Sequence, residues 1–414
     1  MTEIPISTTD WSRTVAKEAQ IPLLNRYYEE DPLHTSGVGT ALLSRPGLRK
    51  WKTVGAGPIR GVAEQLGMFG NGLFVVSDTT LYKISPTETV TTIGSGLAGS
   101  PNGYVSMCFT DNYLFAADGT NLWVYTDNSF AVGTLTDSGV ITTGEQVKID
   151  TIYYQFTSGA VDTGTPAGTS GAPWLVAMGT SISTSLANLA KAIKGTGVAG
   201  TDYSTLLLAH TSVVVSLVTS TTIKIRAKTA GSAGNALATT ETGANLAWGA
   251  ATLTTGGSTV FTTVPLPDAV GAVWVDTLNS YVLVVVAQGF GKNGRFYWVQ
   301  PGEQIVNALD FATAERAPDP LYSVTTLGDQ FWLFGSSTTE VWYATGNGDA
   351  PFQRIQGRLF DRGIWGGTSV KIGDTMIVTD RDGVVWKVGQ GITRVSNNSI
   401  EQRIREAMAL ELRV

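Results

Sequence analysis

Asp329-Gln-Phe-Trp-Leu-Phe-Gly-Ser-Ser-Thr-Thr-Glu-Val-Trp342 is the stretch of sequence that decides the fold. A turn residue precedes a mostly apolar run, and a polar cluster separates that run from a second segment that ends in Trp342. Consecutive apolar residues favour a buried strand and Gly, Ser and Thr favour chain reversal, so the pattern predicts a β-hairpin. The same pattern recurs at residues 71–82, 112–123 and 374–386, and a looser copy begins at Asn279 and closes at residues 295–299.

The spacing of these copies predicts how they assemble. From Asn71 to Asn112 is 41 residues, from Asn279 to Asp329 is 50, and from Asp329 to Asp374 is 45. One blade of a β-propeller takes roughly 40–50 residues. Because an isolated hairpin is marginally stable in water, such units stack to bury their faces. The predicted fold is mainly β, a β-propeller-like repeat of four-stranded blades.

One interval is too long for a single blade. From Asn112 to Asn279 is 167 residues, about 120 more than a blade needs. The excess falls at about residues 136–258, where the composition changes to long runs of Gly, Ala, Ser and Thr and the hairpin pattern disappears. We therefore expect an inserted domain at 136–258, in what should be a loop between blades.

Local patterns predict the elements of this insert. Residues 145–156 alternate as a strand, and residues 185–194 carry apolar side chains at helical spacing behind Ser183 or Thr184 as a possible N-cap. A strand pair follows at 213–217 and 222–228. The expectation is a small α+β domain with one helix on a sheet. The propeller then comprises an N-terminal part, residues 1–135, and a C-terminal part, residues 259–397.

A helix is expected at the end of the chain, over residues 398–414. Asn398 is a plausible N-cap with Glu401 three residues on, and Ile400, Ile404 and Met408 share one face. The apolar face is suited to a neighbouring subunit or to the chain's own propeller, and the sequence leaves both open.

Composition bounds the class of protein. Of the 414 residues, 43% are hydrophobic, 15% are charged and 48 are Gly, which indicates a globular chain rich in strands and tight turns. The net charge of −6 opposes tight binding to nucleic acid. The basic run at residues 45–52 indicates a solvated turn and strand start, with contact to DNA or a neighbouring subunit as the alternative. The N-terminus is polar, and no apolar run reaches the ~18 residues of a membrane span.

Two motifs match the residue pattern of a functional site but not its structural context. Gly195-Thr-Gly-Val-Ala-Gly200 has the spacing of a dinucleotide fingerprint, but it follows a predicted helix, whereas the fingerprint works between a strand and the start of a helix. Asp380-Arg-Asp-Gly383 has the start of a calcium loop without its further ligands, and an Asp-Gly hairpin turn explains it.

No catalytic or metal centre is predicted. Cys108 stands in an apolar run, as a small buried hydrophobic residue does, and cannot form an internal disulfide because it is the only Cys. His34 and His210 have no Cys or acidic partner at ligand spacing. We therefore name no catalytic, cofactor-binding or metal residues and expect no cofactor and no enzymatic activity.

The densest carboxylates are Asp310, Glu315 and Asp319. A glycosidase would need two such groups at a set separation across a cleft. The alternative is turn capping by Asp310 and Asp319.

A family resemblance emerges from residues 303–320, which run into Leu333-Phe-Gly-Ser-Ser-Thr-Thr-Glu-Val-Trp342 and then residues 346–366. Matching pieces also stand at residues 25–29, 45–48, 352–355 and 392–401. The chain resembles the packaged-DNA stabilisation family of tailed phages over residues 20–135 and 259–405. The insert resembles, through residues 185–193, 227–241 and 248–257, a small domain inserted in many phage structural proteins.

The resemblance implies a structural role in the virion. Members are tail hub or nozzle proteins of short-tailed phages, assembled as a ring beneath the portal and adaptor that closes the vertex after packaging. It implies a six-fold ring formed in the host cytoplasm, with tail fibre, spike or needle proteins as further partners and double-stranded DNA passing non-specifically.

The chain departs from the family pattern in carrying the insert and in ending at Val414, where relatives continue with more β structure. Closure of the propeller within one chain is therefore an open question. The competing function is a carbohydrate-binding or polysaccharide-degrading propeller of a tail, favoured by the exposed Trp and Tyr that such sites use for stacking on sugars. The 11 Trp of a propeller more often belong to the blade core.

Overall fold

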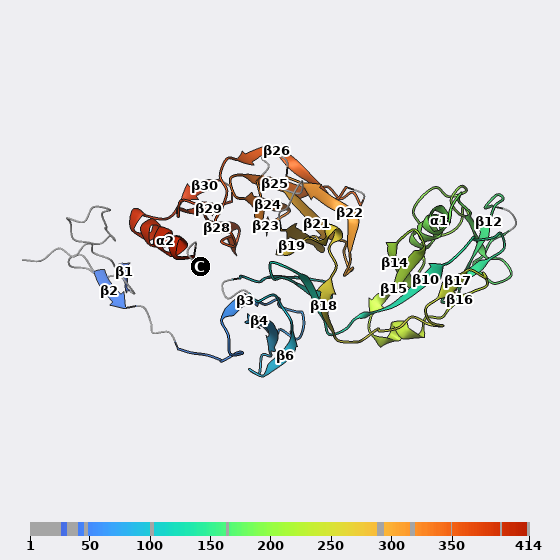
Figure 1. Ribbon diagram of the computed structural model, residues 1–414, viewed down its shortest axis with the longest axis horizontal. Coiled ribbons are helices and arrows are strands. Elements are labelled where there is room, and N and C mark those ends of the chain that lie inside the picture. The colour runs from blue at the N-terminus through green and yellow to red at the C-terminus, as the bar shows by residue number, and fades with distance from the viewer. Residues whose placement is uncertain are drawn as a thin grey trace, which may run out of the picture. The chain divides into compact units, whose positions relative to one another are not determined.

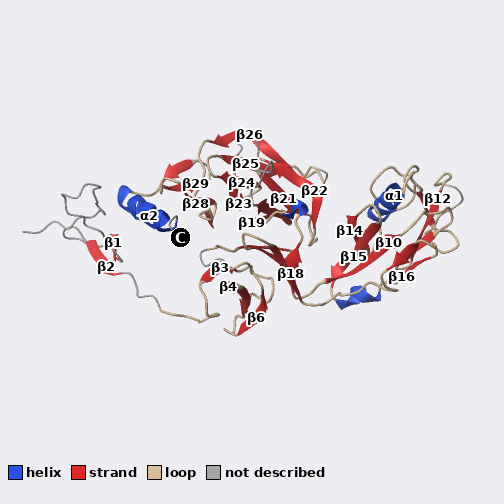
Figure 2. Ribbon diagram, viewed as in Figure 1, coloured by secondary structure: helices blue, strands red, loops and turns tan. Residues whose placement is uncertain are grey.

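The computed structural model describes residues 26–30, 40–44, 49–99, 103–162, 165–287, 294–314, 319–348, 350–389 and 391–411. The chain divides into two compact units (Figure 1). The larger unit holds Pro58–Gly289 and Arg295–Ala312, and the smaller one holds Met1–Gly57, Phe290–Gly294 and Thr313–Val414. Strands dominate both units (Figure 2).

Three sheets of the larger unit share one plan of four strands in a row. The first sheet is β3 (Ile59–Ala63), β4 (Leu73–Ser77), β5 (Thr80–Ile84) and β6 (Val90–Ser95). The second is β7 (Ser106–Thr110), β8 (Tyr113–Ala117), β9 (Leu122–Thr126) and β18 (Val260–Val264). The third is β19 (Ala272–Leu278), β20 (Tyr281–Val286), β21 (Arg295–Val299) and β22 (Val306–Thr313).

The smaller unit repeats the plan twice. Its four-stranded sheets are β23 (Leu321–Leu327), β24 (Gln330–Gly335), β25 (Thr339–Ala344) and β26 (Phe352–Phe360), then β27 (Val370–Ile372), β28 (Thr375–Thr379), β29 (Val385–Val388) and β30 (Ile392–Arg394). A two-stranded antiparallel sheet of β1 (Arg26–Glu30) and β2 (Thr40–Ser44) lies near the start of the chain.

The predicted hairpins are confirmed as the second and third strands of each sheet. The turn residues that marked the repeat all stand between first and second strands, and the closing aromatic residues Tyr82, Trp123, Trp298, Trp342 and Trp386 all stand on third strands. The fold is therefore the β-propeller-like repeat of four-stranded blades that the sequence predicts.

Burial on two sides explains the apolar runs of the second strands. In β8, Leu114 and Ala116 pack in a cluster with the first sheet, whereas Tyr113, Phe115 and Ala117 pack in a cluster with the third. Successive side chains of a strand point to opposite faces, so a sheet covered on both faces needs an apolar residue at every position. The last two sheets pack face to face in the same way, around Trp332, Phe334 and Met376.

The insert interrupts a blade. The chain leaves the second sheet after its third strand, β9, and returns as the fourth strand, β18, which pairs with β9. The expectation that the insert occupies a loop between blades is therefore wrong. The reason is that β18 completes its sheet only after the detour, and its sequence lacks the hairpin pattern that marks strands two and three.

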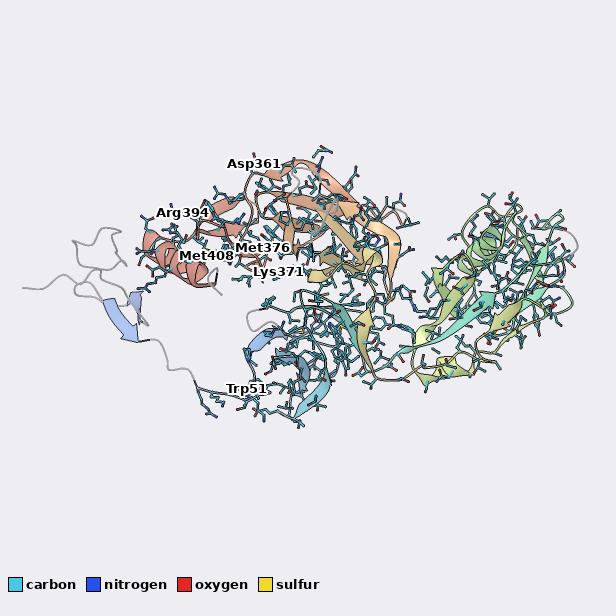
Figure 3. The ribbon with its side chains drawn as sticks, viewed as in Figure 1. Trp51, Asp361, Lys371, Met376, Arg394 and Met408 are labelled. Carbon is cyan, nitrogen blue, oxygen red and sulfur yellow. The ribbon has the colours of Figure 1, made fainter. Side chains whose placement is uncertain are left out.

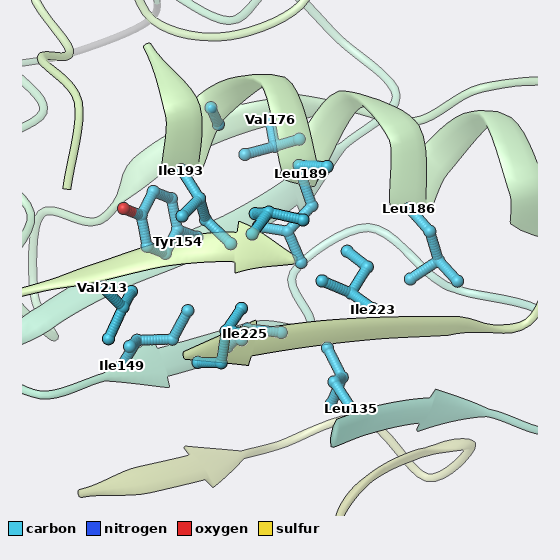
Figure 4. Packing of buried hydrophobic residues seen from close by; sticks show 14 of the residues in the cluster. Leu135, Ile149, Tyr154, Val176, Leu186, Leu189, Ile193, Val213, Ile223 and Ile225 are labelled. Carbon is cyan, nitrogen blue, oxygen red and sulfur yellow. The ribbon is translucent and has the colours of Figure 1, made fainter. Parts of the chain in front are cut away.

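The insert holds two four-stranded sheets and a helix. One sheet has the order β14 (Val213–Val218), β15 (Thr222–Ala230), β10 (Phe130–Asp137) and β17 (Leu246–Trp248). The other has the order β13 (Trp174–Ala177), β12 (Ile152–Thr157), β11 (Gln146–Ile149) and β16 (Thr239–Glu241). Helix α1 (Ile182–Lys194) packs Leu186, Leu189 and Ile193 into a core shared with both sheets (Figure 4). Short 3-10 helices occupy Ser232–Ala236 within the insert and Pro267–Ala269 after it.

Two local predictions for the insert need correction. The strand expected over 145–156 is a hairpin of β11 and β12, because Asp150 takes a left-handed turn conformation with φ 54°. The N-cap of α1 is Ser181, not Ser183 or Thr184, since its side chain accepts from Thr184 N while the Thr184 side chain caps Ser181 N. The strand pair at 213–217 and 222–228 is confirmed as β14 and β15.

The N-cap of helix α2 (Asn398–Glu411) lies one residue before the predicted one. Asn397, not Asn398, accepts the hydrogen bond from Ile400 N (3.0 Å). Burial alone would raise the pKa of Glu401, but hydrogen bonds from Ser396 and Arg394 outweigh it and hold that pKa below its usual range. The helix thus packs on its own blade through Glu401 and through Arg405, whose Nη1 donates to Asp382 O (2.9 Å), while Ile400 stays 43% exposed.

Buried His210 makes the stability of the insert pH-dependent. Its Nε2–H donates to Ile149 O (3.1 Å), and its Nδ1 accepts from Ser212 N (3.1 Å), an arrangement of the neutral ring. Burial lowers the pKa of His210 below 6.5, so protonation favours the unfolded state and stability is lost as pH falls below 6.5, by up to about 1.4 kcal/mol per pH unit.

The check is the thermal midpoint measured from about pH 7 to about pH 5, the range in which a histidine titrates. His210→Asn should lower the midpoint at neutral pH and flatten its pH dependence. His34→Asn is the matched control, because it removes the only other histidine. An unchanged slope in His210→Asn would assign the pH dependence to other groups.

Candidate functional site

Buried carboxylates paired with Trp hold the hairpins of two blades. Asp118 Oδ2 accepts from Trp123 Nε1 (2.7 Å) in the second sheet, and Asp380 Oδ2 accepts from Trp386 Nε1 (2.8 Å) in the fifth. In both, the acid ends the second strand and the indole stands on the third. The Asp carboxylates and Trp indole N–H groups of the repeat thus hydrogen-bond one another within the blade. Their role is therefore structural.

Asp118 also ties one blade to the next. It accepts from Thr120 N (2.9 Å) and Asn121 N (2.6 Å) in its own turn and from Ala98 N (2.7 Å), which follows the first sheet. Burial acts to raise the pKa of Asp118, but the backbone and indole donors prevail and lower it. The carboxylate is therefore an ionised hub for N–H groups of two blades.

Asp380 shows that the Asp-Arg-Asp-Gly motif is a turn. Its Oδ1 accepts from Asp382 N and Val384 N, both at 2.9 Å, and its Oδ2 also accepts from Arg362 Nη1 (2.8 Å). The Arg362 guanidinium lies 4.1 Å from the Trp386 ring centroid. Protein donors thus occupy both oxygens, as the turn interpretation requires.

Asp310 and Asp319, two of the three dense carboxylates, each accept hydrogen bonds from donors in their own surroundings. Asp319 caps the second hairpin turn of its blade by accepting from Ser337 N (2.7 Å) and Thr338 N (3.0 Å). Asp310 lies on β22 and accepts from Gln300 Nε2 (3.0 Å), and Glu315 lies outside the described residues. Asp319 therefore caps a turn 18 residues further along the chain and not its own Asp-Pro turn, and Asp310 bonds the Gln300 side chain where turn capping was expected.

The glycine motif follows a helix, as expected. Gly195 is the left-handed C-cap of α1 (φ 66°), and its N–H donates to Ala192 O. Gly200 N donates to Tyr203 O (2.7 Å). The motif therefore ends a helix, whereas a pyrophosphate needs the N–H groups at a helix start.

Cys108 and the described residues of the basic run do not belong to a catalytic or metal-binding site. Cys108 is buried in β7, and burial, with Asp276 nearby, raises its pKa. His34 and residues 45–48 of the basic run lie outside the described residues, and Arg49, Lys50, Trp51 and Lys52 are exposed. Within the described part of the chain, no cluster of three metal-ligating residues occurs, and no helix is long and apolar enough to span a membrane.

The insert is joined to the third sheet by a buried ion pair. Arg226 Nε on β15 lies 2.8 Å from Glu303 Oε1, in the turn between β21 and β22, with side-chain exposures of 12% and 11%. The guanidinium stacks 4.5 Å from the Phe130 ring centroid. Gly302 has φ +73°, and a Cβ there would lie 2.5 Å from Arg226 Nη2, so glycine makes room for the pair. The insert thus contacts the third sheet through a largely buried ion pair.

Positive charges on the insert offset part of the cost of burying Glu303 at this contact. Burial raises the pKa of Glu303, and the charges of Arg226, Lys194 and Lys224 on the insert counter that effect. Burial also raises the pKa of Asp310, which Lys194 counters too. A basic edge of the insert thus faces an acidic edge of the third sheet. Sequence reasoning missed the pair because its members are 77 residues apart and no spacing pattern links Arg226 to Glu303.

Fold and site together define a β-propeller-like structural protein with a domain inserted into one blade. The family model described as Bacteriophage P22 Gp10, beta-propeller, matches residues 183–414. That is more than half of the 414 residues, so the chain belongs to this phage stabilisation family. The match begins inside α1 and includes much of the insert, whereas the expected resemblance began at residue 20 and omitted the insert. The chain therefore has a structural role in a phage.

Comparison with solved structures returns propellers of other origins. The Dos1 propeller is 11% identical, with 89% of this chain and 72% of that chain covered and a TM-score of 0.32. The Cps50 (Swd1) propeller of Myceliophteria thermophila is 9% identical, with 83% of this chain and 87% of that chain covered and a TM-score of 0.33. Kluyveromyces lactis Hsv2 is 11% identical, with 84% of this chain and 78% of that chain covered and a TM-score of 0.27. No curated protein matches the chain.

Proposed function

We propose that this chain is a subunit of the tail hub or nozzle of a short-tailed phage. It assembles as a ring, expected to be a hexamer, below the portal and adaptor, retains packaged DNA and forms part of the ejection conduit without catalysing a reaction. The observation that carries the proposal is the family match over residues 183–414, which spans the last three four-stranded sheets and α2.

Charge is consistent with a conduit. The net charge of −6 means that long-range electrostatics do not draw the chain onto phosphates. Each Lys or Arg that neutralises a phosphate adds affinity through counterion release, which would slow DNA passing along the wall. A wall with few such contacts permits fast passage.

The test is purification of the full chain with and without the portal protein. Electron microscopy should show a closed ring, because identical head-to-tail contacts close with cyclic symmetry, and the ring should co-purify with portal. A monomer that ignores portal and degrades polysaccharide would overturn the proposal in favour of a carbohydrate-active propeller. A ring lumen lined mainly by Lys and Arg would contradict the conduit.

We further propose that the insert is a separately folding module that meets a tail fibre, spike, needle or adaptor protein. Its two ends meet at one point, where Ser129 N donates to Ser258 O (3.1 Å) and Ser258 N donates to Ser129 Oγ (3.0 Å). Strand β10 crosses the boundary expected at residue 136, so we place the module between Ser129 and Ser258. Adjacent ends are typical of inserted domains.

Deleting residues 130–257 should leave a folded propeller. The join replaces the Ser129 and Ser258 hydrogen bonds by a short covalent link, so β9 still pairs with β18. We expect soluble protein and an unchanged ring in electron micrographs, with loss of the partner that the insert contacts. Deleting residues 136–258 is the matched control, because it cuts β10 and leaves residues 130–135 unpaired. Loss of all soluble protein in the first variant would contradict the prediction.

A further inference from the structure

An open polar cleft lies between the last two sheets of the smaller unit. It has a volume of about 400 Å³ and is lined mainly by the first hairpin turns of the two blades, residues 327–330 and 371–374, together with Trp332, Arg358 and Gly389. Small-molecule sites take about 300–1,000 Å³. Lys371, the middle residue of β27, is labelled in Figure 3.

The cleft is built on a rigid base. Buried Ser323 and Thr325 on β23 both hydrogen-bond Ser369 Oγ, which precedes β27, at 2.9 Å. Below the cleft, Trp332 stacks on Phe360 at 5.4 Å and belongs to the core shared by the two sheets. These contacts hold the two turns at a set separation, so a ligand would meet a preformed site.

The two turns present the same chemistry. Each carries Gly followed by Asp, and Gly328 and Gly373 adopt φ +64° and +61° with open space where a Cβ would stand. The glycines are therefore required by the backbone, and each places an Asp, Asp329 or Asp374, on the rim of the cleft. No ion-pair partner of either Asp occurs among the residues that the structure describes.

Donors line the same hollow. Arg358 Nη1 donates to Gln330 Oε1 (2.7 Å), which leaves other guanidinium N–H groups and the Gln330 amide N–H groups available. Lys371 adds an exposed ammonium. Trp332 also lines the cleft, and its buried Nε1 has no hydrogen-bond partner within the described part of the chain. Two cations and two carboxylates give the lining no net charge.

We propose that this cleft binds a neutral saccharide unit. An anionic ligand would meet two carboxylates, and a cationic one would meet Arg358 and Lys371. Sugar hydroxyls both donate and accept, so one ligand satisfies both sets, and charge-assisted hydrogen bonds of this kind are the stronger ones. This site is inferred from the lining of the cleft alone and does not rest on the proposed ring and conduit function.

The test is saturation-transfer NMR on the full chain with a panel of methyl glycosides of neutral hexoses, deoxyhexoses and N-acetylhexosamines at millimolar concentration. Glucuronic acid and glucosamine serve as the anionic and cationic probes. We expect saturation of at least one neutral sugar. The double variant Asp329→Asn with Asp374→Asn should weaken that binding about tenfold or more, since losing even one hydrogen bond to a charged group costs about this much affinity.

Matched controls sit on the other hairpin turn of the same blade. Arg381→Gln and Asp382→Asn remove a cation and a carboxylate outside the cleft and should leave binding unchanged. Thermal midpoints of all variants check the fold. The inference is overturned if no neutral sugar saturates, if the charged probes bind better, or if the double variant binds like the wild type. Failure would leave the ring and portal experiments unaffected.

Discussion

Replacing Arg226 by Met is expected to cost about 3–5 kcal/mol of unfolding free energy, because it leaves the Glu303 carboxylate buried without its partner. Met keeps the apolar contact with the Phe130 ring but supplies neither charge nor a donor. The free energy, measured by denaturant unfolding, is the first readout. The second is protease sensitivity of the links near Ser129 and Ser258, since a released insert exposes them.

The stability loss in Arg226→Met should depend on pH. Burial already raises the pKa of Glu303, and removal of Arg226 raises it further. A carboxyl whose folded pKa exceeds its unfolded value destabilises the fold once ionised, so the loss in Arg226→Met should be largest near neutral pH and shrink as pH falls. A pH-independent loss would mean that the damage is steric.

Glu303→Gln is the matched control for the other partner. Arg226 then keeps its stacking on Phe130 and its hydrogen bond to Ala227 O (3.3 Å), so we expect a loss of only about 1 kcal/mol. The double variant should lose less than Arg226→Met, because neither charge of the pair then remains buried. Equal losses in the two single variants would contradict the asymmetry.

Replacing Asp118 by Ala should cost about 2–4 kcal/mol, because it strands the N–H groups of Ala98, Thr120, Asn121 and Trp123. The Trp123 ring, stacked 4.8 Å from Phe261 on β18, loses the bond that orients it. The damage should therefore spread to the strand that follows the insert. Denaturant unfolding and hydrogen exchange at β18 measure the two effects.

The pH dependence of stability distinguishes the loss of the ionised Asp118 carboxylate from the loss of side-chain volume in Asp118→Ala. The pKa of Asp118 is lowered in the folded state, so its contribution is present above the unfolded pKa, about 3.9, and is lost as pH falls through the folded pKa. Asp127→Ala is the control on the same hairpin. Asp127 is 40% exposed and pairs with Lys83 at 3.6 Å, so its loss should cost about 0–1 kcal/mol. Equal losses of unfolding free energy in the two variants would contradict the claim that Asp118 stabilises the fold through these N–H groups.

Local patterns in the sequence predicted the elements that depend on near neighbours. The turn residues and apolar runs of residues 71–82, 112–123 and 374–386 set the hairpins, because chain reversal and strand burial follow from residues a few positions apart. The same reasoning placed α1 and the β14–β15 pair. It failed at caps and short turns, such as Ser181 and Asp150, where one residue's φ or side-chain bond decides the boundary.

Pairs distant in the chain were decided by tertiary structure alone. Arg226 meets Glu303, Asp118 meets Ala98, and the last two blades close a polar cleft, and none of these contacts leaves a signal in spacing. The sequence by itself determined a repeated four-stranded blade, because its apolar periodicity is local. Which carboxylates are capped, where the insert docks and where a cleft opens depend on burial and packing between segments, which only the folded chain brings together.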